Sequence, residues 1–433
     1  MTLFSHRAHE DPAQEAAQLL TRLGLFLLFM VSPAAPAVSG RTIYVLLPIG
    51  AALLLSGAAV SPATRNKTRP LLQLLTAPPV LASAFLVAWA GLSLAWSPFS
   101  AGPAERLLKS VLTLALVAVS GGLLPQRTRV CDMNLLPIGA FVAAAALAVV
   151  AILGLDKNHP PTLEELVDGS AVARAGVALA LILWPAAGAL ALRGRWGFAA
   201  ALVLGASSAA YASGAPNVGP ALIAGLLAFA ASFGRVRGTA RLFGWAAAGM
   251  ILGAPLVATL ARYAPGGHAS DFMRALDIWG ALAVNGGART LTGHGFGAAH
   301  FGLFGGYLDP HTPRSLLFQI WFDFGIVGAA AFAFGAFRTF AVVGGLRPAL
   351  APFLIAGLVA GFVIATLGPA AEQLWAVTAA GLDAIAFVLV MRGQFRRRRP
   401  SLPKGLRPRV DSIMFGDEDD GAGLDSAAFR PSE

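Results

Sequence analysis

The feature that most constrains this chain is a succession of apolar runs, each close to the length that crosses a lipid bilayer. A spanning helix needs about 20 mostly apolar residues, and such runs follow one another between residues 23 and 391. They are continuous rather than alternating, which argues against a transmembrane β-barrel. Only 12% of the 433 residues are charged, whereas soluble proteins carry about 25%. The sequence therefore predicts an all-α, polytopic membrane bundle, and its single cysteine, Cys131, forms no internal disulfide.

About twelve spanning helices are expected. They lie at residues 23–38, 43–61, 79–97, 107–124, 135–154, 173–192, 197–213, 219–234, 242–261, 315–337, 349–367 and 373–391. Residues 1–22 form a cytoplasmic segment that lacks a cleavable-signal pattern, and its residues 11–20 are expected to make a short interfacial helix. Residues 23–391 make the transmembrane domain. The tail, residues 392–433, contains prolines and then acidic residues, and is predicted to be disordered.

Lysines and arginines in the short loops set the expected orientation, because cytoplasmic loops are enriched in them. With twelve spans, the basic loops alternate correctly and both termini are cytoplasmic. These loops lie at residues 65–69, 127–129, 193–195, 235–241, 338–347 and from 392 onward. The net charge of +10 is then mostly a topology signal, so nucleic acid is not an expected partner.

Two loops on the opposite, periplasmic face are long enough to hold chemistry, at residues 155–172 and 262–314. Five of the seven histidines fall in them: His159, His268, His294, His300 and His311. Arginines on this face do not follow the orientation rule, so their presence there needs another explanation. They are Arg174, Arg262, Arg274, Arg289 and Arg314. A guanidinium holds two phosphate oxygens at once, so the set predicts an anionic partner.

Two of these arginines stand out by position. Arg174 heads a long apolar run, where a charge is costly unless it faces a cavity or a partner; the alternative is that it reaches the headgroup layer. Arg274 lies in a segment, residues 271–279, whose apolar spacing predicts a helix on the membrane surface. There the alternative is a solvated arginine on an interfacial helix.

His311 is the candidate general base, because imidazole titrates near pH 6.5 and prolines stiffen the loop around it. An ordinary loop histidine is the alternative. His294 belongs to the glycine-rich stretch 293–297, which follows no strand and opens no clear helix, so we expect a tight backbone turn rather than a phosphate loop. The histidine spacings fit no compact metal-ligand motif, and no metal or other cofactor is expected.

Three acidic or amide side chains lie in the interior of the expected spans. Gln319 and Asp323 are four residues apart and share a helix face, and Asp383 lies in the last span. A polar side chain at that depth indicates a polar lumen, a proton relay or a pair with an arginine from another helix.

Three segments together resemble the bacterial O-antigen ligase and Wzy polymerase superfamily. The first is Arg174 followed by an apolar run into Trp184-Pro185. The second is Arg274, then Ile278-Trp279, then the glycine-rich stretch 293–297. The third is His311, then Gln319 and the Trp-Phe-Asp-Phe-Gly sequence of residues 321–325. The similarity covers residues 20 to 390 in layout and is residue-specific only in these segments.

The resemblance implies transfer of a glycan from undecaprenyl diphosphate to an acceptor, lipid A-core, at the periplasmic face of the bacterial inner membrane. It needs no metal. It implies that Arg174, Arg274 and Arg314 bind the diphosphate, that His311 activates the acceptor hydroxyl, and that His294, Gln319 and Asp323 support the site. The family's base lies five residues before the Gln, where this chain has Arg314, and its Glu is Asp323 here.

Other functions stay open. A Wzy-type polymerase of O-antigen or exopolysaccharide shares the donor chemistry and these motifs. A twelve-span transporter or flippase would use Asp323 or Asp383 as its coupling site. A catalytically inactive relative would bind lipid-linked glycan without transferring it. The enzyme hypothesis predicts that Arg174, Arg274 and His311 converge on one cavity at the periplasmic face.

Overall fold

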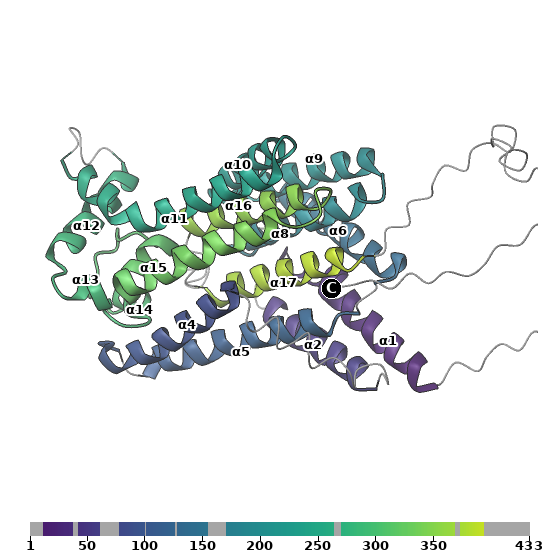
Figure 1. The fold of residues 1–433 in the computed structure, drawn as a ribbon, viewed down its shortest axis with the longest axis horizontal. Coiled ribbons are helices and arrows are strands. Elements are labelled where there is room, and N and C mark those ends of the chain that lie inside the picture. The colour runs from purple at the N-terminus through teal and green to yellow at the C-terminus, as the bar shows by residue number, and fades with distance from the viewer. Residues whose placement is uncertain are drawn as a thin grey trace, which may run out of the picture. The chain divides into compact units, whose positions relative to one another are not determined.

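A computed structural model describes residues 12–37, 42–60, 78–99, 101–125, 128–154, 170–263, 270–368 and 373–393. Helices dominate these ranges (Figure 1), and the only β pairing within them is an isolated bridge between Thr128 and Gly393. The all-α prediction is therefore confirmed. The expected loop at residues 155–172 and the expected tail at 392–433 lie almost entirely outside the described ranges.

The helices follow one another along the chain. They are α1 (Pro12–Phe26), α2 (Thr42–Val60), α4 (Pro78–Ser93), α5 (Ala101–Leu123), α6 (Val130–Leu153), α8 (Ala171–Ala191), α9 (Trp196–Ala212), α10 (Val218–Ser232), α11 (Val236–Ala261), α12 (Asp271–Asn285), α13 (Arg289–Thr292), α14 (Ala298–Phe304), α15 (Leu316–Gly344), α16 (Ala351–Leu367) and α17 (Leu374–Met391). Short π and 3-10 turns extend α1 and α4: η1 (Leu27–Val31), η2 (Ala35–Ala37) and η4 (Leu94–Trp96).

Nine of the helices in the described ranges are long and apolar enough to cross a membrane. They are α1 with η1, α2, α4 with η4, α5, α6, α8, α11, α15 and α17. Three further apolar helices, α9, α10 and α16, have 17, 15 and 17 residues. Each of the expected spans overlaps one of these helices. The chain is thus a multi-pass membrane protein by the length and apolarity of its helices.

The first span begins earlier than expected. A single helical stretch runs from Pro12 to Val31, so the expected boundary at residue 22 falls inside α1, and the short interfacial helix and the first span are one element. Proline explains both limits, because it is tolerated in the first turn of a helix and breaks the interior. Pro12 opens α1, and Pro33 and Pro36 follow its end.

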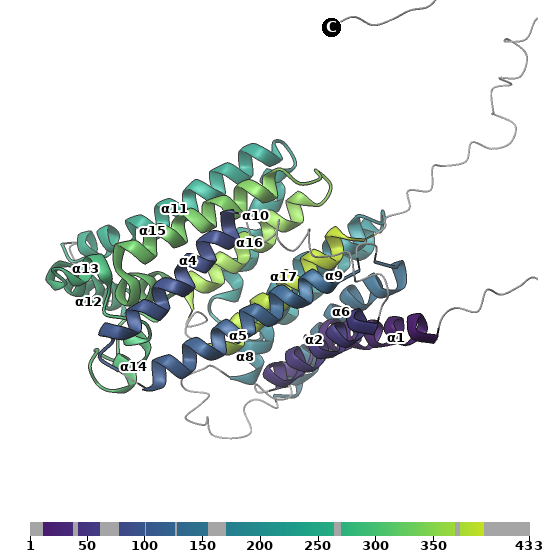
Figure 2. The same cartoon turned by 60° about the horizontal axis from the view of Figure 1, so that its bottom comes forward.

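Helix α8 is the most enclosed of the spanning helices: 89% of the residues in its most apolar 18-residue stretch are buried. It packs against α6, α9, α10, α16 and α17. Small residues permit these close approaches, as is usual between membrane helices: a Cβ at Gly225 would lie 2.5 Å from the indole of Trp184. A second group of helices surrounds α15, which lies along α4, α11 and α16 (Figure 2).

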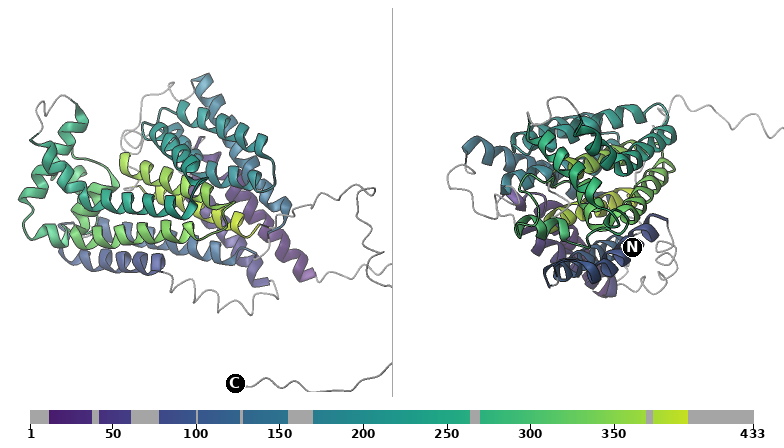
Figure 3. Two further views of the ribbon diagram at one scale, coloured as in Figure 1. Left: turned by 45° about the horizontal axis from the view of Figure 1, so that its top comes forward. Right: turned by 90° about the vertical axis from the view of Figure 1, so that its left-hand side faces the viewer.

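The arginine-rich connections gather at one end of the helices, here named the Arg392 end. There Arg392 donates to the carbonyl of Gly122 (3.3 Å), Arg193 donates to the carbonyl of Val130 (2.9 Å), and Arg22 pairs with Asp132 (3.5 Å). Helices α12, α13 and α14 lie at the opposite end, beyond the ends of α11 and α15, and we name it the α12 end (Figure 3). Of the basic loops that the sequence assigns to one side, those at Arg193 and Arg392 therefore lie together in the part of the chain that the structure describes.

Candidate functional site

Arg274 and His311, two of the three residues expected to converge, come together at the α12 end. Arg274 lies on α12, and Nη1 of its guanidinium is 3.5 Å from Nε2 of His311. Nδ1 of His311 is 3.1 Å from Oδ1 of Asp309, which also accepts the backbone N–H of His311 (2.8 Å). Arginine, imidazole and carboxylate thus form one chain of contacts, although the two residues bearing the first two groups are 37 positions apart.

The carboxylate of Asp309 orients the imidazole of His311. The backbone N–H and the side chain of His311, with a smaller contribution from the charge of Arg274, lower the pKa of Asp309. An ionised carboxylate is an acceptor, so Nδ1 of His311 carries a hydrogen. Nε2 faces Arg274, and the imidazole is 42% exposed. A hydroxyl group arriving from solvent therefore meets an oriented base beside a cation.

The glycine-rich stretch 293–297 is a backbone turn, and it docks on a break in α15. Gly293, Gly295 and Gly297 have φ of 75°, 99° and 80°, values that favour glycine. Gly325 interrupts α15 with φ of 62° and ψ of −158°. A Cβ at Gly293 would lie 2.2 Å from the carbonyl oxygen of Asp323, so only glycine permits this contact.

The break frees carbonyls of α15, and groups outside the helix donate to them. The backbone N–H of His294 donates to Phe322 (2.8 Å) and that of Gly295 to Asp323 (3.0 Å). The indole of Trp89, on α4, donates to the carbonyl of Phe324 (3.2 Å). Because buried carbonyls need partners in a membrane protein, the turn and the broken helix stabilise each other.

Asp323 anchors the turn with its side chain as well. The carboxylate is fully buried, and its two oxygens accept the backbone N–H groups of Gly297 (3.0 Å) and Ala299 (2.8 Å). Ala299 lies in the first turn of α14, which does open directly after the glycine-rich stretch, contrary to expectation. The site is favourable for a carboxylate because the first N–H groups of a helix have no helical partner. Asp323 therefore supports the site structurally.

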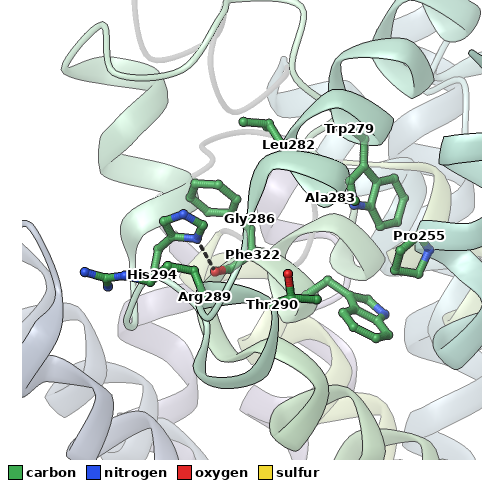
Figure 4. Close-up of a pocket in the computed structure, with 10 residues that line it drawn as sticks. Pro255, Trp279, Leu282, Ala283, Gly286, Arg289, Thr290, His294 and Phe322 are labelled. Atoms are coloured by element: carbon green, nitrogen blue, oxygen red, sulfur yellow. Dashed lines mark hydrogen bonds between the residues drawn. The ribbon is translucent and has the colours of Figure 1, made fainter.

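His294 lies next to the break in a fixed orientation (Figure 4). Its ring stacks on Phe322 at 4.0 Å with 8° between the planes, and Nδ1 donates to the carbonyl of Phe322 (3.2 Å). Burial lowers the pKa of His294, and the positive charge of Arg289 lowers it further, whereas the Phe322 carbonyl opposes this. The imidazole is thereby kept neutral, with Nε2 available as an acceptor.

A small cavity of about 40 Å³ adjoins His294. Its lining includes Trp279, Thr290 and Arg289 (Figure 4). Trp321 lines it as well. The indole of Trp321 donates to the carbonyl of Ile251 (2.7 Å). That carbonyl needs an outside donor because Pro255, four residues later in α11, has no N–H.

The structure does not pack Arg174 against the other candidates. Arg174 is only 5% exposed in the first turns of α8, whose main neighbours are α6, α9, α16 and α17, whereas α12 packs mainly on α11. Arg314 is half-buried shortly after His311, and its side chain makes no hydrogen bond or ion pair with any residue the structure describes. Gln319 is buried one turn before Asp323.

Sequence reasoning left Asp309, Trp89 and Ser93 out of the site. Asp309 had a local signal, because a carboxylate two residues before a histidine can bond to its backbone and its ring. Ser93, whose hydroxyl accepts the backbone N–H of Phe296 (2.9 Å), and Trp89 had none: each bonds to a residue more than 200 positions away.

Chemically, the α12 end offers two oriented imidazoles, those of His294 and His311, and two arginines, Arg289 and Arg274, each close to one of them. Among the residues that the structure describes, no group of three or more His, Cys, Asp or Glu side chains lies close enough to hold a metal ion. Comparison with known proteins finds no matching family model, no matching curated protein and no matching solved structure.

Proposed function

We propose that this protein is an O-antigen ligase-like glycosyltransferase, which moves a glycan from undecaprenyl diphosphate to an acceptor such as lipid A-core. The observation that carries the proposal is the chain of contacts from Arg274 through His311 to Asp309. Transfer at an anomeric carbon requires removal of a hydroxyl proton and stabilisation of a departing diphosphate. An oriented imidazole supplies the first and an adjacent guanidinium the second.

Twelve crossings agree with the way the helices are connected. Helix α15 ends at the Arg392 end and α17 begins at the α12 end, so the 17-residue α16 between them has to cross. The α9–α10 hairpin leaves the Arg392 end and turns at Asn217, whose amide donates to the carbonyl of Ile364 (3.3 Å), near the far end of α16. The α9–α10 hairpin therefore reaches through the same depth of the bundle as α16.

Orientation follows from the charges. The Arg392 end collects the arginines of the short loops, and by the positive-inside rule it is the cytoplasmic side of a bacterial inner membrane. The α12 end, with Arg274, His294 and His311, is then periplasmic, where lipid-linked glycans are available. Arg174 lies in the first turns of α8, whose last turn is at the Arg392 end, so it is also on the periplasmic half.

The roles of the residues follow from this placement. His311 accepts the proton of the acceptor hydroxyl at Nε2, and Asp309 stabilises the imidazolium that results. Arg274 stabilises the negative charge of the departing diphosphate. Arg314, which has no partner among the described side chains, is available to the same anion, whereas Arg174, which lies in α8 away from these residues, has no role in this site. Asp323 and Gln319 keep the turn and α15 in place.

The test is transfer by the purified protein, with an undecaprenyl-diphosphate-linked glycan as donor and lipid A-core as acceptor. Removing a general base costs about 10²–10⁴-fold in rate, so we expect that loss for His311→Ala and a smaller one for Asp309→Asn. Arg274→Ala is expected to abolish most transfer. Arg241→Ala is the matched control, because Arg241 is an exposed arginine in the first turns of α11, toward the Arg392 end.

Near-normal transfer by Arg274→Ala or His311→Ala would overturn the proposed site. Unchanged lipopolysaccharide and exopolysaccharide ladders after deletion of the gene would overturn the proposed function. A polymerase, which shares the donor chemistry, is recognised by products that lengthen the glycan without joining it to lipid A-core.

A transporter or flippase is the second candidate, and the break of α15 at Gly325 favours it, because transporters use broken helices at their substrate sites. In those proteins the freed backbone groups face a cavity. Here Phe322, Asp323 and Phe324 use their carbonyls to bind the protein's own donors. The carboxylate of Asp323 is likewise engaged by backbone N–H groups, so the break serves the glycine-rich turn, and the transferase is preferred.

A further inference from the structure

A long apolar groove lies between α6 and α9, far from the α12 end site. Its volume is about 770 Å³, and most of its lining residues belong to α6 and α9, two helices that lie close together in Figure 1. The lining is mainly Ala, Ile, Leu and Phe, and the only charged side chain in it is Arg195. Asn134 lies at the same end as Arg195, while Ile152 and Ala212 mark the other end.

The groove opens toward the lipid and runs through the depth of the membrane. Phe141 and Ile152, on its α6 wall, are 65% and 82% exposed, and Phe198 on α9 is 70% exposed. From Asn134 to Ile152 the helix rises about 27 Å at about 1.5 Å per residue, close to the hydrocarbon thickness of about 30 Å. An apolar chain lying in the groove therefore stays within the hydrocarbon layer.

The charge at the Arg392 end of the groove is not neutralised by the protein. The side chain of Arg195 is exposed and makes no ion pair with any residue in the described ranges. Arg193 is two residues away, and its guanidinium donates to Asn134 and to the carbonyl of Val130. Burial lowers the pKa of Arg193, and the positive charge of Arg195 lowers it further. Asp132, two residues after Val130, is paired with Arg22.

Two guanidinium groups that repel each other at the mouth of an apolar groove match a ligand with an anionic head and an apolar chain. We propose that the groove binds an anionic phospholipid of the leaflet at the Arg392 end, with its phosphate on Arg195 and an acyl chain between α6 and α9.

Two glycines of α9 provide a matched pair of variants. A Cβ added at Gly205 or at Gly197 meets no atom within 4 Å, so a larger side chain fits the fold at either position. Gly205 lines the groove and Gly197 does not. Gly205→Phe therefore fills the groove, and Gly197→Phe tests the cost of the same substitution on the same helix. Arg195→Ala removes the cation, with Arg241→Ala as its control.

The experiment is native mass spectrometry of the full chain, released from detergent in the presence of phosphatidylglycerol or phosphatidylcholine. One arginine near an anionic lipid surface contributes enough for about a fivefold change in affinity. We expect phosphatidylglycerol to be retained at least fivefold better than phosphatidylcholine, Arg195→Ala to remove this preference, and Gly205→Phe to lose the lipid altogether. Gly197→Phe and Arg241→Ala are expected to behave as the unmodified chain.

Equal retention of both lipids, or an unchanged preference in Arg195→Ala, would overturn the proposal. The same holds if Gly205→Phe retains as much phosphatidylglycerol as Gly197→Phe. A dimer that Gly205→Phe dissociates would also overturn it, because a second copy of the chain would then be the occupant of the groove.

Discussion

Removal of the Asp323 carboxylate gives the sharpest test of how the α12 end is held together. Its oxygens accept the backbone N–H groups of Gly297 and Ala299 at 3.0 and 2.8 Å in a fully buried position. A hydrogen bond to a charged group contributes about 1.5–3 kcal/mol, so the two bonds together contribute about 3–6 kcal/mol. Asp323→Ala deletes both and leaves two buried N–H groups without these acceptors.

Amide hydrogen exchange measures this loss where it occurs. Because about 1.4 kcal/mol corresponds to a factor of ten, the lower figure of about 3 kcal/mol predicts exchange roughly 100-fold faster in peptides covering residues 293–304. Peptides from α16 are expected to keep their protection, since opening of the turn is local. Asp277→Asn is the control: Asp277 pairs with Arg262 at 3.1 Å, but both side chains are about one-third exposed, and such pairs contribute about 0–1 kcal/mol.

Unchanged exchange in residues 293–304 of Asp323→Ala would refute the anchoring role. If α16 also loses protection, the variant has unfolded as a whole. Asp323→Asn then tests whether the side chain of Asp323 anchors the turn. The amide keeps one acceptor oxygen and replaces the other with a donor, so exchange is expected between that of the unmodified chain and that of Asp323→Ala. Exchange equal to that of the unmodified chain would again contradict the reasoning.

Three further predictions concern the same region. Gly293→Ala is expected to lower the melting temperature more than Gly306→Ala: both have positive φ, but only Gly293 would place a Cβ against backbone, 2.2 Å from the carbonyl of Asp323. Trp321→Phe should lower the free energy of unfolding by about 1–3 kcal/mol, because it leaves the carbonyl of Ile251 without its donor. Pro255→Ala restores a backbone N–H to that carbonyl, so a double-mutant cycle should show a smaller loss for Trp321→Phe in this background. The pKa of His294 is lowered in the fold, so the unfolded chain binds the proton more readily than the folded chain as pH falls through about 6.5, and the free energy of unfolding decreases there. The difference between the melting temperatures at pH 7.5 and 5.5 should therefore be smaller in His294→Gln than in the unmodified chain. An equal difference in the two proteins would contradict this.

Periodicity and composition were sufficient for the helical class and for most of the spans. Apolar runs of about 20 residues leave a chain in lipid no other way to satisfy its backbone than a helix, and each expected span overlaps a helix. The helix that contains the first expected span begins and ends earlier than that span, because apolarity alone located the span. The prolines at residues 12, 33 and 36 place the observed limits at Pro12 and Val31.

Spacing along the chain also indicated that the glycine-rich stretch is a backbone turn, since three alternate glycines permit positive φ. It did not indicate what the turn binds. The partners of that turn, Ser93 and Asp323, come from α4 and α15, and a contact across more than 200 residues has no local signature.

What the sequence by itself determined is the class of the protein, the order of its helices and the set of basic loops, because these follow from local composition and periodicity. Only the tertiary structure decided which polar residues meet. It joined Arg274 to His311 and gave His311 the orienting carboxylate of Asp309. It buried Arg174 in α8 instead, among other helices. The physical reason is that a charged side chain on a helix carries no record in its own sequence of the helix that packs against it.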